Sequence, residues 1–174
     1  MKKNAVAKGL VPDCGESATD DILYIVQLLQ SHRYREAEAA AAQALAHHPT
    51  GDHHALLYSL KGQALANQSA FEEALACFQV GKPCDIGAVE SCVMEAVCWL
   101  HLDRPEAALE CCDRALACHP DYAQGWLFRG VALHRLGRYR EAYQCYQQAA
   151  PEDSPPRSLL QRIQHWWQGR SSQA

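Results

Sequence analysis

Apolar positions recur along the chain at an interval of 34 residues. Cys77, Cys111 and Cys145 are separated by this interval, and so are Cys84 and Cys118. A second series keeps the same step: Ala74, Ala108 and Ala142. The residues that lead into these alanines are also alike: FEEAL at 71–75, PEAAL at 105–109 and YREAY at 139–143. A fixed period of this length predicts a repeat architecture.

Each copy of the repeat is predicted to form two antiparallel helices. Small residues such as Ala74 and Ala108 allow the two helices to approach closely, and large ones such as Phe78 and Tyr146 fill the space beside them. One helical hairpin cannot bury its apolar faces alone, so neighbouring copies are expected to stack. We place the copies at about 20–51, 55–88, 89–122 and 123–150.

The two ends of the chain differ from the repeats. Glycine and proline interrupt residues 1–19, which we expect to be a flexible N-terminal tail. Residues 154–168 are predicted to form a helix, because Ser154 is a good N-cap and an apolar stripe follows it. The stripe consists of Leu159, Leu160, Ile163, Trp166 and Trp167. We interpret this helix as a cap on the last repeat, and the alternative is a docking helix for a partner.

The repeated pattern resembles the tetratricopeptide repeat. The last copy carries the resemblance best, with Trp126, Gly130, Leu133, Tyr139, Ala142, Tyr146 and Ala149 at the family's spacing. The resemblance covers roughly residues 20–150 and implies an all-α fold. We therefore expect a superhelical solenoid of about 3.5–4 helical hairpins, closed by the C-terminal capping helix.

Composition narrows the classes of function. The chain has 174 residues, which fits one domain, and 20 acidic against 16 basic residues give a net charge of −4. This balance argues against a general nucleic-acid binder. No apolar run approaches the ~20 residues that a membrane-spanning helix needs. Nine cysteines, an odd number without an export signal, predict a reducing compartment, so we expect a cytoplasmic protein.

Two groups of residues could in principle bind a metal. The cysteines form no Cys-x-x-Cys pair, and their repeat spacing favours a packing role over zinc binding. The histidine-rich loop contains His47, His48, His53 and His54, which we interpret as solvated. No phosphate-binding loop or hydrolase motif is present, although a Cys–His nucleophile formed in space stays open. We therefore expect no enzyme activity, no cofactor and no metal.

The resemblance implies that the first helix of each hairpin lines a concave groove. The predicted groove residues are Leu23, Val26, Leu60, Gln63, Asn67, Met94, Val97, His101, Leu127, Phe128, Val131 and Arg135. Many are apolar, which favours an extended apolar segment or a helix as the ligand. The alternative is that some of them point into neighbouring helices or lie under the C-terminal helix. The cationic clamp that some family members use for acidic chaperone tails is absent, because its positions hold residues such as Met94 and Phe128.

Size, repeat number and local sequence also resemble the class II chaperones of bacterial type III secretion. The similar segments are 23–24, 30–37, 85–86 and 95–100. This resemblance implies a cytoplasmic monomer or homodimer that binds a hydrophobic secreted protein before export. The alternative function is a general scaffold or assembly factor without a secretion role. In either case we expect a protein or peptide partner, with no nucleic acid and no membrane insertion.

Overall fold

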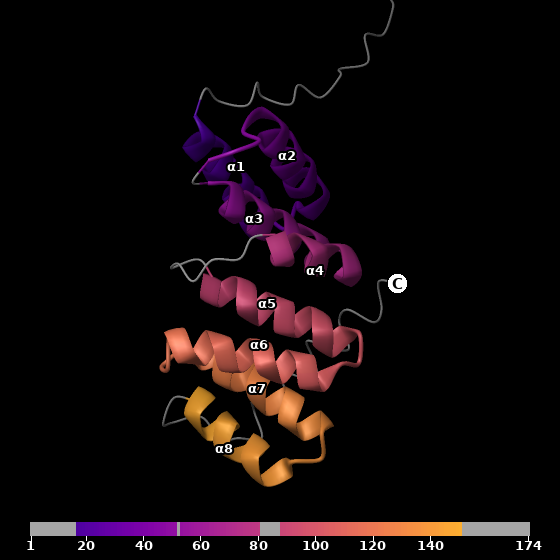
Figure 1. Ribbon diagram of the computed structural model, residues 1–174, viewed down its shortest axis with the longest axis vertical. Helices are drawn as coiled ribbons and strands as arrows, with labels where there is room; N and C mark the ends of the chain where they lie inside the picture. Colours follow the sequence, from indigo (N-terminus) through magenta and orange to yellow (C-terminus); the bar gives the residue numbers. More distant parts are fainter. Residues whose placement is uncertain (1–16, 52, 81–87, 151–174) are drawn as a thin grey trace, which may run out of the picture.

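The computed structural model describes residues 17–51, 53–80 and 88–150, and these ranges contain eight helices and no strand. Figure 1 shows the helices stacked in chain order, from α1 at one end to α8 at the other. Their bounds are α1 Ala18–Gln30, α2 Tyr34–His47, α3 His54–Asn67, α4 Phe71–Val80, α5 Ala88–His101, α6 Pro105–Cys118, α7 Ala123–Arg135 and α8 Tyr139–Ala149. The prediction of an all-α helical repeat superhelix is confirmed.

The helices pair along the chain as four hairpins, α1–α2 to α7–α8. The predicted tail is wrong at its end, because α1 begins at Ala18 rather than after residue 19. The cause is local: the Ser17 side chain accepts a hydrogen bond from the Thr19 N–H at 3.3 Å and caps the helix. Residues 1–16 and the predicted capping helix at 154–168 lie outside the described residues.

In two of the hairpins, the two helices approach each other closely because a glycine on the first helix faces an aromatic ring on the second. A Cβ atom on Gly62 would lie 2.7 Å from Phe78, and one on Gly130 would lie 2.5 Å from Tyr146. Both rings are buried. The glycines therefore allow the rings to lie directly against the backbone of the first helix.

The other two hairpins fill the equivalent positions with different residues. The third hairpin has Ala96 and Cys112, which belong to one buried cluster. The first hairpin reverses the order of sizes, with Ile25 on the first helix and Ala41 on the second, again within one cluster. The first hairpin thus exchanges which helix supplies the large residue, whereas the third hairpin uses two small residues.

The turn inside each hairpin has the same backbone conformation. One residue at the equivalent position has a positive φ in every case: His32 (58°), Ser69 (67°), Asp103 (56°) and Gly137 (75°). Each turn also carries the two backbone bonds of a Schellman motif, for example Ala70 N–H to Leu65 O at 3.0 Å and Ser69 N–H to Ala66 O at 3.1 Å. Only the last turn places glycine, the residue that suits this conformation, at the strained position.

We therefore expect Ser69→Gly to raise the free energy of unfolding by about 1 kcal/mol, because it removes the left-handed strain of a side chain. The matched change Gly137→Ala is expected to lower it by about 1 kcal/mol for the same reason. Urea unfolding of both variants, followed by circular dichroism, measures the two shifts. A stability change of the same sign in both variants would contradict this account.

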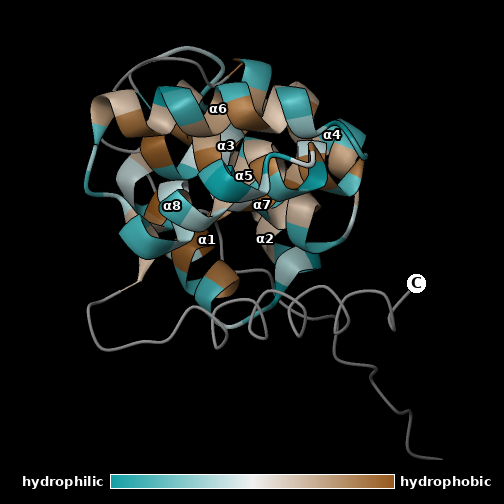
Figure 2. Ribbon diagram, turned by 90° about the horizontal axis from the view of Figure 1, so that it is seen from below, coloured by the Kyte–Doolittle hydropathy of each residue, from teal (hydrophilic) through white to brown (hydrophobic). Residues whose placement is uncertain are grey.

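Adjacent hairpins contact each other through the second helix of one and the first helix of the next, and also through their first helices. Contacts join α1 with α3, α3 with α5, and α5 with α7, whereas no contact joins two second helices within the described ranges. The stack is therefore tighter on the side of the first helices, and we call this side the inner face. Hydrophobic and hydrophilic residues alternate along the helices (Figure 2). None of the helices in the described ranges is long and apolar enough to cross a bilayer.

Candidate functional site

The inner face is the surface on which the sequence placed the groove residues. Three of them, Leu60, Val97 and Val131, are buried. Leu60 belongs to the core cluster of the first hairpin, and Val131 belongs to the cluster that joins the last two. The prediction that these three side chains line an open groove is therefore wrong. Their apolar character stabilises the contact between adjacent hairpins instead.

The other apolar groove residues remain at least partly accessible. Leu23 is 61% exposed, and Val26 on the same helix packs partly against the first core cluster. Met94 packs against the cluster between the second and third hairpins, and Leu127 and Phe128 pack against the cluster that includes α7 and α8. The inner face therefore offers apolar surface at both ends of the stack, with the largest exposed side chain on α1.

Two of the four polar groove residues, Arg135 and His101, link neighbouring hairpins. Arg135 donates to Leu100 O at 2.7 Å and lies 3.3 Å from Asp103 Oδ1, so it links the fourth hairpin to the third. His101 stacks on Phe71 with ring centroids 4.3 Å apart, which links the third hairpin to the second. Asn67 donates to the carbonyl of Gln63 within its own helix at 2.8 Å, and the Gln63 side chain is partly exposed.

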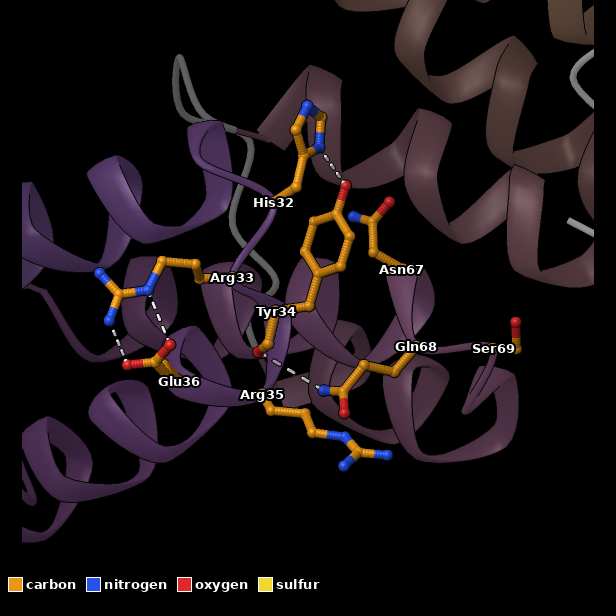
Figure 3. Close-up of a pocket in the computed structure, with 8 residues that line it drawn as sticks. All are labelled: His32, Arg33, Tyr34, Arg35, Glu36, Asn67, Gln68 and Ser69. Carbon is orange, nitrogen blue, oxygen red and sulfur yellow. Dashed lines mark hydrogen bonds and ion pairs between the residues drawn. The ribbon is translucent and has the colours of Figure 1, made fainter. Parts of the chain in front are cut away.

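The structure also contains a pocket that the sequence analysis missed. It has a volume of about 420 Å³ and lies between the first two hairpins. We call it the turn pocket, and its lining residues are His32, Arg33, Tyr34, Arg35, Glu36, Asn67, Gln68 and Ser69 (Figure 3). They come from the turn and first residues of α2, and from the end of α3 and its turn. The residues form two short runs, 32–36 and 67–69, so only alignment of the two turns could have indicated the pocket.

Hydrogen bonds fix the walls of the turn pocket. His32 Nδ1 lies 2.6 Å from the Tyr34 hydroxyl, and Gln68 donates to Glu38 at 2.7 Å across the junction of the two hairpins. Arg33 forms a two-point hydrogen-bonded ion pair with Glu36. This guanidinium lowers the pKa of Glu36, mainly through the hydrogen bond, so the carboxylate stays charged and balances Arg33.

The buried cysteines of the described ranges show no sign of an activated thiolate. They are Cys77, Cys98, Cys111, Cys112 and Cys145. Burial raises the pKa of Cys111 to about 12, and burial also raises the pKa values of Cys77 and Cys112. A neutral buried thiol is a poor nucleophile.

The histidine-rich loop is not assembled around a common centre. His48 lies 3.4 Å from the buried carboxylate of Asp21, and His54 lies edge-on to the Tyr58 ring. Within the described ranges, no three His, Cys, Asp or Glu side chains are grouped in a way that could hold a metal ion.

Comparisons with known proteins agree with this geometry. The family model described as "Tetratricopeptide repeat" matches residues 27–88 and 96–156. None of the curated proteins compared with the chain matches it. A tetratricopeptide repeat protein from Parabacteroides merdae is similar in structure, with a TM-score of 0.69 and 18% identity over 88% of this chain. The chain covers 62% of that protein, so it spans less than two thirds of its length.

Two further solved structures come from proteins that bind peptides. YrrB, a protein described as having an unusual peptide-binding site, has a TM-score of 0.62 and 20% identity, over 79% of this chain and 70% of its own. The second repeat domain of Spaghetti (RPAP3), bound to the HSP90 peptide SRMEEVD, has a TM-score of 0.52 and 23% identity, over 55% of this chain and 88% of its own. At these identities the likeness concerns the fold. The family model covers more than half of the sequence, and the chain belongs to the tetratricopeptide repeat family.

Proposed function

We propose that the protein is a non-enzymatic interaction module that binds an extended segment or helix of a partner protein along its inner face. The observation that carries the proposal is the exposure of Leu23 on α1, beside the half-buried Val26, at the end of the stack where a first helix covers α1 on one side only. An exposed leucine next to other apolar groups gains most from being covered by an apolar side chain of a partner. The peptide complex of RPAP3, which shares the fold, supports this use of the architecture.

The partner is expected to be apolar where it meets α1 and α7. Val26 lies near Leu23 at the first end, and Leu127 and Phe128 offer partly accessible surface at the other. Gln63, on α3 between these ends, can accept and donate hydrogen bonds to a partner backbone. The inner face therefore favours a ligand with apolar side chains spaced along an extended backbone.

Two biological roles fit this proposal. A secretion chaperone would hold a hydrophobic translocator in the cytoplasm, and the sequence resemblance described above supports that role. A general scaffold would use the same face for soluble partners. Co-expression separates them, because a chaperone keeps an otherwise insoluble translocator in the soluble fraction and a scaffold does not. The cytoplasmic location and the choice between monomer and homodimer stay predictions.

Selection from a random-peptide display library against the purified chain tests the binding function. We expect apolar peptides to be enriched, with Kd values of about 1–100 µM. Leu23→Asp is expected to weaken their binding at least about tenfold, because it places a charge against an apolar ligand.

Tyr143→Asp is the matched control, since Tyr143 is 51% exposed but lies on α8, a second helix. We expect this variant to bind as the unchanged chain does, and both variants should keep the helical circular dichroism spectrum. Equal binding by the unchanged chain and by Leu23→Asp would overturn the proposed site. Failure to enrich any peptide would overturn the proposed function.

A further inference from the structure

The turn pocket lies at a position that the protein's own side chains occupy at the other two junctions between hairpins. At the second junction, His101 stacks on Phe71 with its ring nearly parallel, at an interplanar angle of 8°. His101 lies 34 residues after Asn67 and ends the first helix of its hairpin in the same way, and Phe71 begins the second helix of its hairpin as Tyr34 does, 37 residues earlier. At the first junction, Tyr34 therefore supplies the aromatic ring of such a stack, but Asn67 has a shorter side chain than His101.

The third junction is filled as well, by a longer side chain at the same register position. Arg135 corresponds to Asn67 and reaches across to Leu100 O and Asp103. Asn67 instead bonds to the Gln63 carbonyl of its own helix, 2.8 Å away. Figure 3 shows its short side chain near the Tyr34 hydroxyl, with Gln68 further along the ring. Asn67 has a shorter side chain than His101 or Arg135, so it fills less of this junction.

The charges that line the turn pocket favour an anion. Arg33 and Glu36 are paired, whereas Arg35 has no ion-pair partner in the described part of the chain. Figure 3 shows Arg35 below Gln68, on the side of Tyr34 opposite to the Arg33–Glu36 pair. The lining residues therefore carry one positive charge in excess, beside an aromatic surface, and the nearby Glu38 carboxylate accepts a hydrogen bond from Gln68.

We propose that the turn pocket is a second binding site, which takes an aromatic side chain of a partner peptide next to an acidic residue. The aromatic ring stacks on Tyr34 as His101 stacks on Phe71, and the carboxylate of the neighbouring residue pairs with Arg35. A volume of about 420 Å³ lies within the range of small-ligand sites. This site lies at the hairpin turns and includes Asn67, at the end of α3, but none of the apolar groove residues.

Titration of the ¹⁵N-labelled full chain with the capped dipeptide acetyl-Phe-Asp-amide, followed by NMR, tests the site. We expect chemical-shift changes at His32, the Asn67 side-chain amide and Ser69, and much smaller changes with acetyl-Ala-Asp-amide. Asn67→His places in the first junction the residue that fills the second, and is expected to abolish the changes. Tyr34→Leu removes the aromatic ring on which the ligand stacks and is expected to weaken binding about five- to tenfold.

Arg35→Glu supplies the sharpest control, because Arg35 is an exposed surface residue that folding does not require. This variant is expected to bind acetyl-Phe-Lys-amide better than acetyl-Phe-Asp-amide, the reverse of the unchanged chain. Circular dichroism confirms that each variant is folded. Shift changes spread over the surface, or equal changes in the unchanged chain and in Asn67→His, would overturn the turn pocket as a site. Leu23→Asp should leave this titration unchanged, so the two proposals fail separately.

Discussion

Gly130→Ala is expected to lower the free energy of unfolding by about 2 kcal/mol, although alanine is the better helix former. The added Cβ would lie 2.5 Å from Cε1 and 2.7 Å from Cδ1 of Tyr146. The Tyr146 ring is only 4% exposed and lies within the buried cluster of the last two hairpins, so it has little room to move. Overpacking of this kind costs about 1–3 kcal/mol, and the severe overlap places it at the upper end. Urea unfolding monitored by circular dichroism measures the change.

The third hairpin supplies the matched control for this prediction. Ala96 and Cys112 occupy the positions of Gly130 and Tyr146, so the double variant Gly130→Ala/Tyr146→Cys copies a pair that the protein already uses. Tyr146→Cys alone leaves a cavity and is expected to cost about 3 kcal/mol. The double variant should be more stable than the sum of the two changes by at least about 1 kcal/mol. Additive effects, or no loss in Gly130→Ala, would show that the ring and the glycine are not coupled.

These pairs also show how far the sequence could predict the fold. The 34-residue period, with Ala74, Ala108 and Ala142 in register, was enough to predict the helical hairpins and their stacking. The first hairpin was harder to recognise, because Ile25 stands where Gly62 and Gly130 stand in other copies. The structure gives the reason: Ala41 on the second helix is correspondingly small. A repeat signature that requires glycine on the first helix and an aromatic residue on the second cannot detect a pair with the large residue on the first helix and the small one on the second.

The candidate site was less predictable than the fold. A register position indicates which helix face a residue occupies, but burial depends on how closely the next hairpin approaches. Leu60 and Leu23 occupy equivalent positions on α3 and α1, yet Leu60 is buried and Leu23 is exposed. The helix α3 contacts first helices on both sides, whereas α1, at the end of the stack, contacts a first helix on one side only. The turn pocket depends in the same way on side-chain length at a junction, which no single repeat reveals.

Arg114→Met is the other change for which we expect a large effect, a loss of about 2–3 kcal/mol in the free energy of unfolding. Glu95 on α5 is a charged residue that is only 7% exposed, and its Oε2 lies 2.5 Å from Arg114 Nη2 on α6. The same guanidinium nitrogen lies 3.2 Å from Cys111 Sγ. Removal of Arg114 leaves the carboxylate beside a thiol with no cation, in a place that water reaches poorly.

The two side chains of this ion pair differ in solvent exposure, and this difference makes the prediction testable. The Arg114 side chain is 44% exposed, so water can solvate it in Glu95→Gln, and we expect that variant to lose about 1 kcal/mol. Replacement of both residues by methionine removes the buried charge and should recover most of the stability lost in Arg114→Met. Arg138→Met is the control, because its pair with Glu141 is exposed and should contribute less than about 0.5 kcal/mol. If Arg114→Met were no more destabilising than Arg138→Met, the Glu95 carboxylate would not depend on its partner, and packing alone would hold α5 against α6.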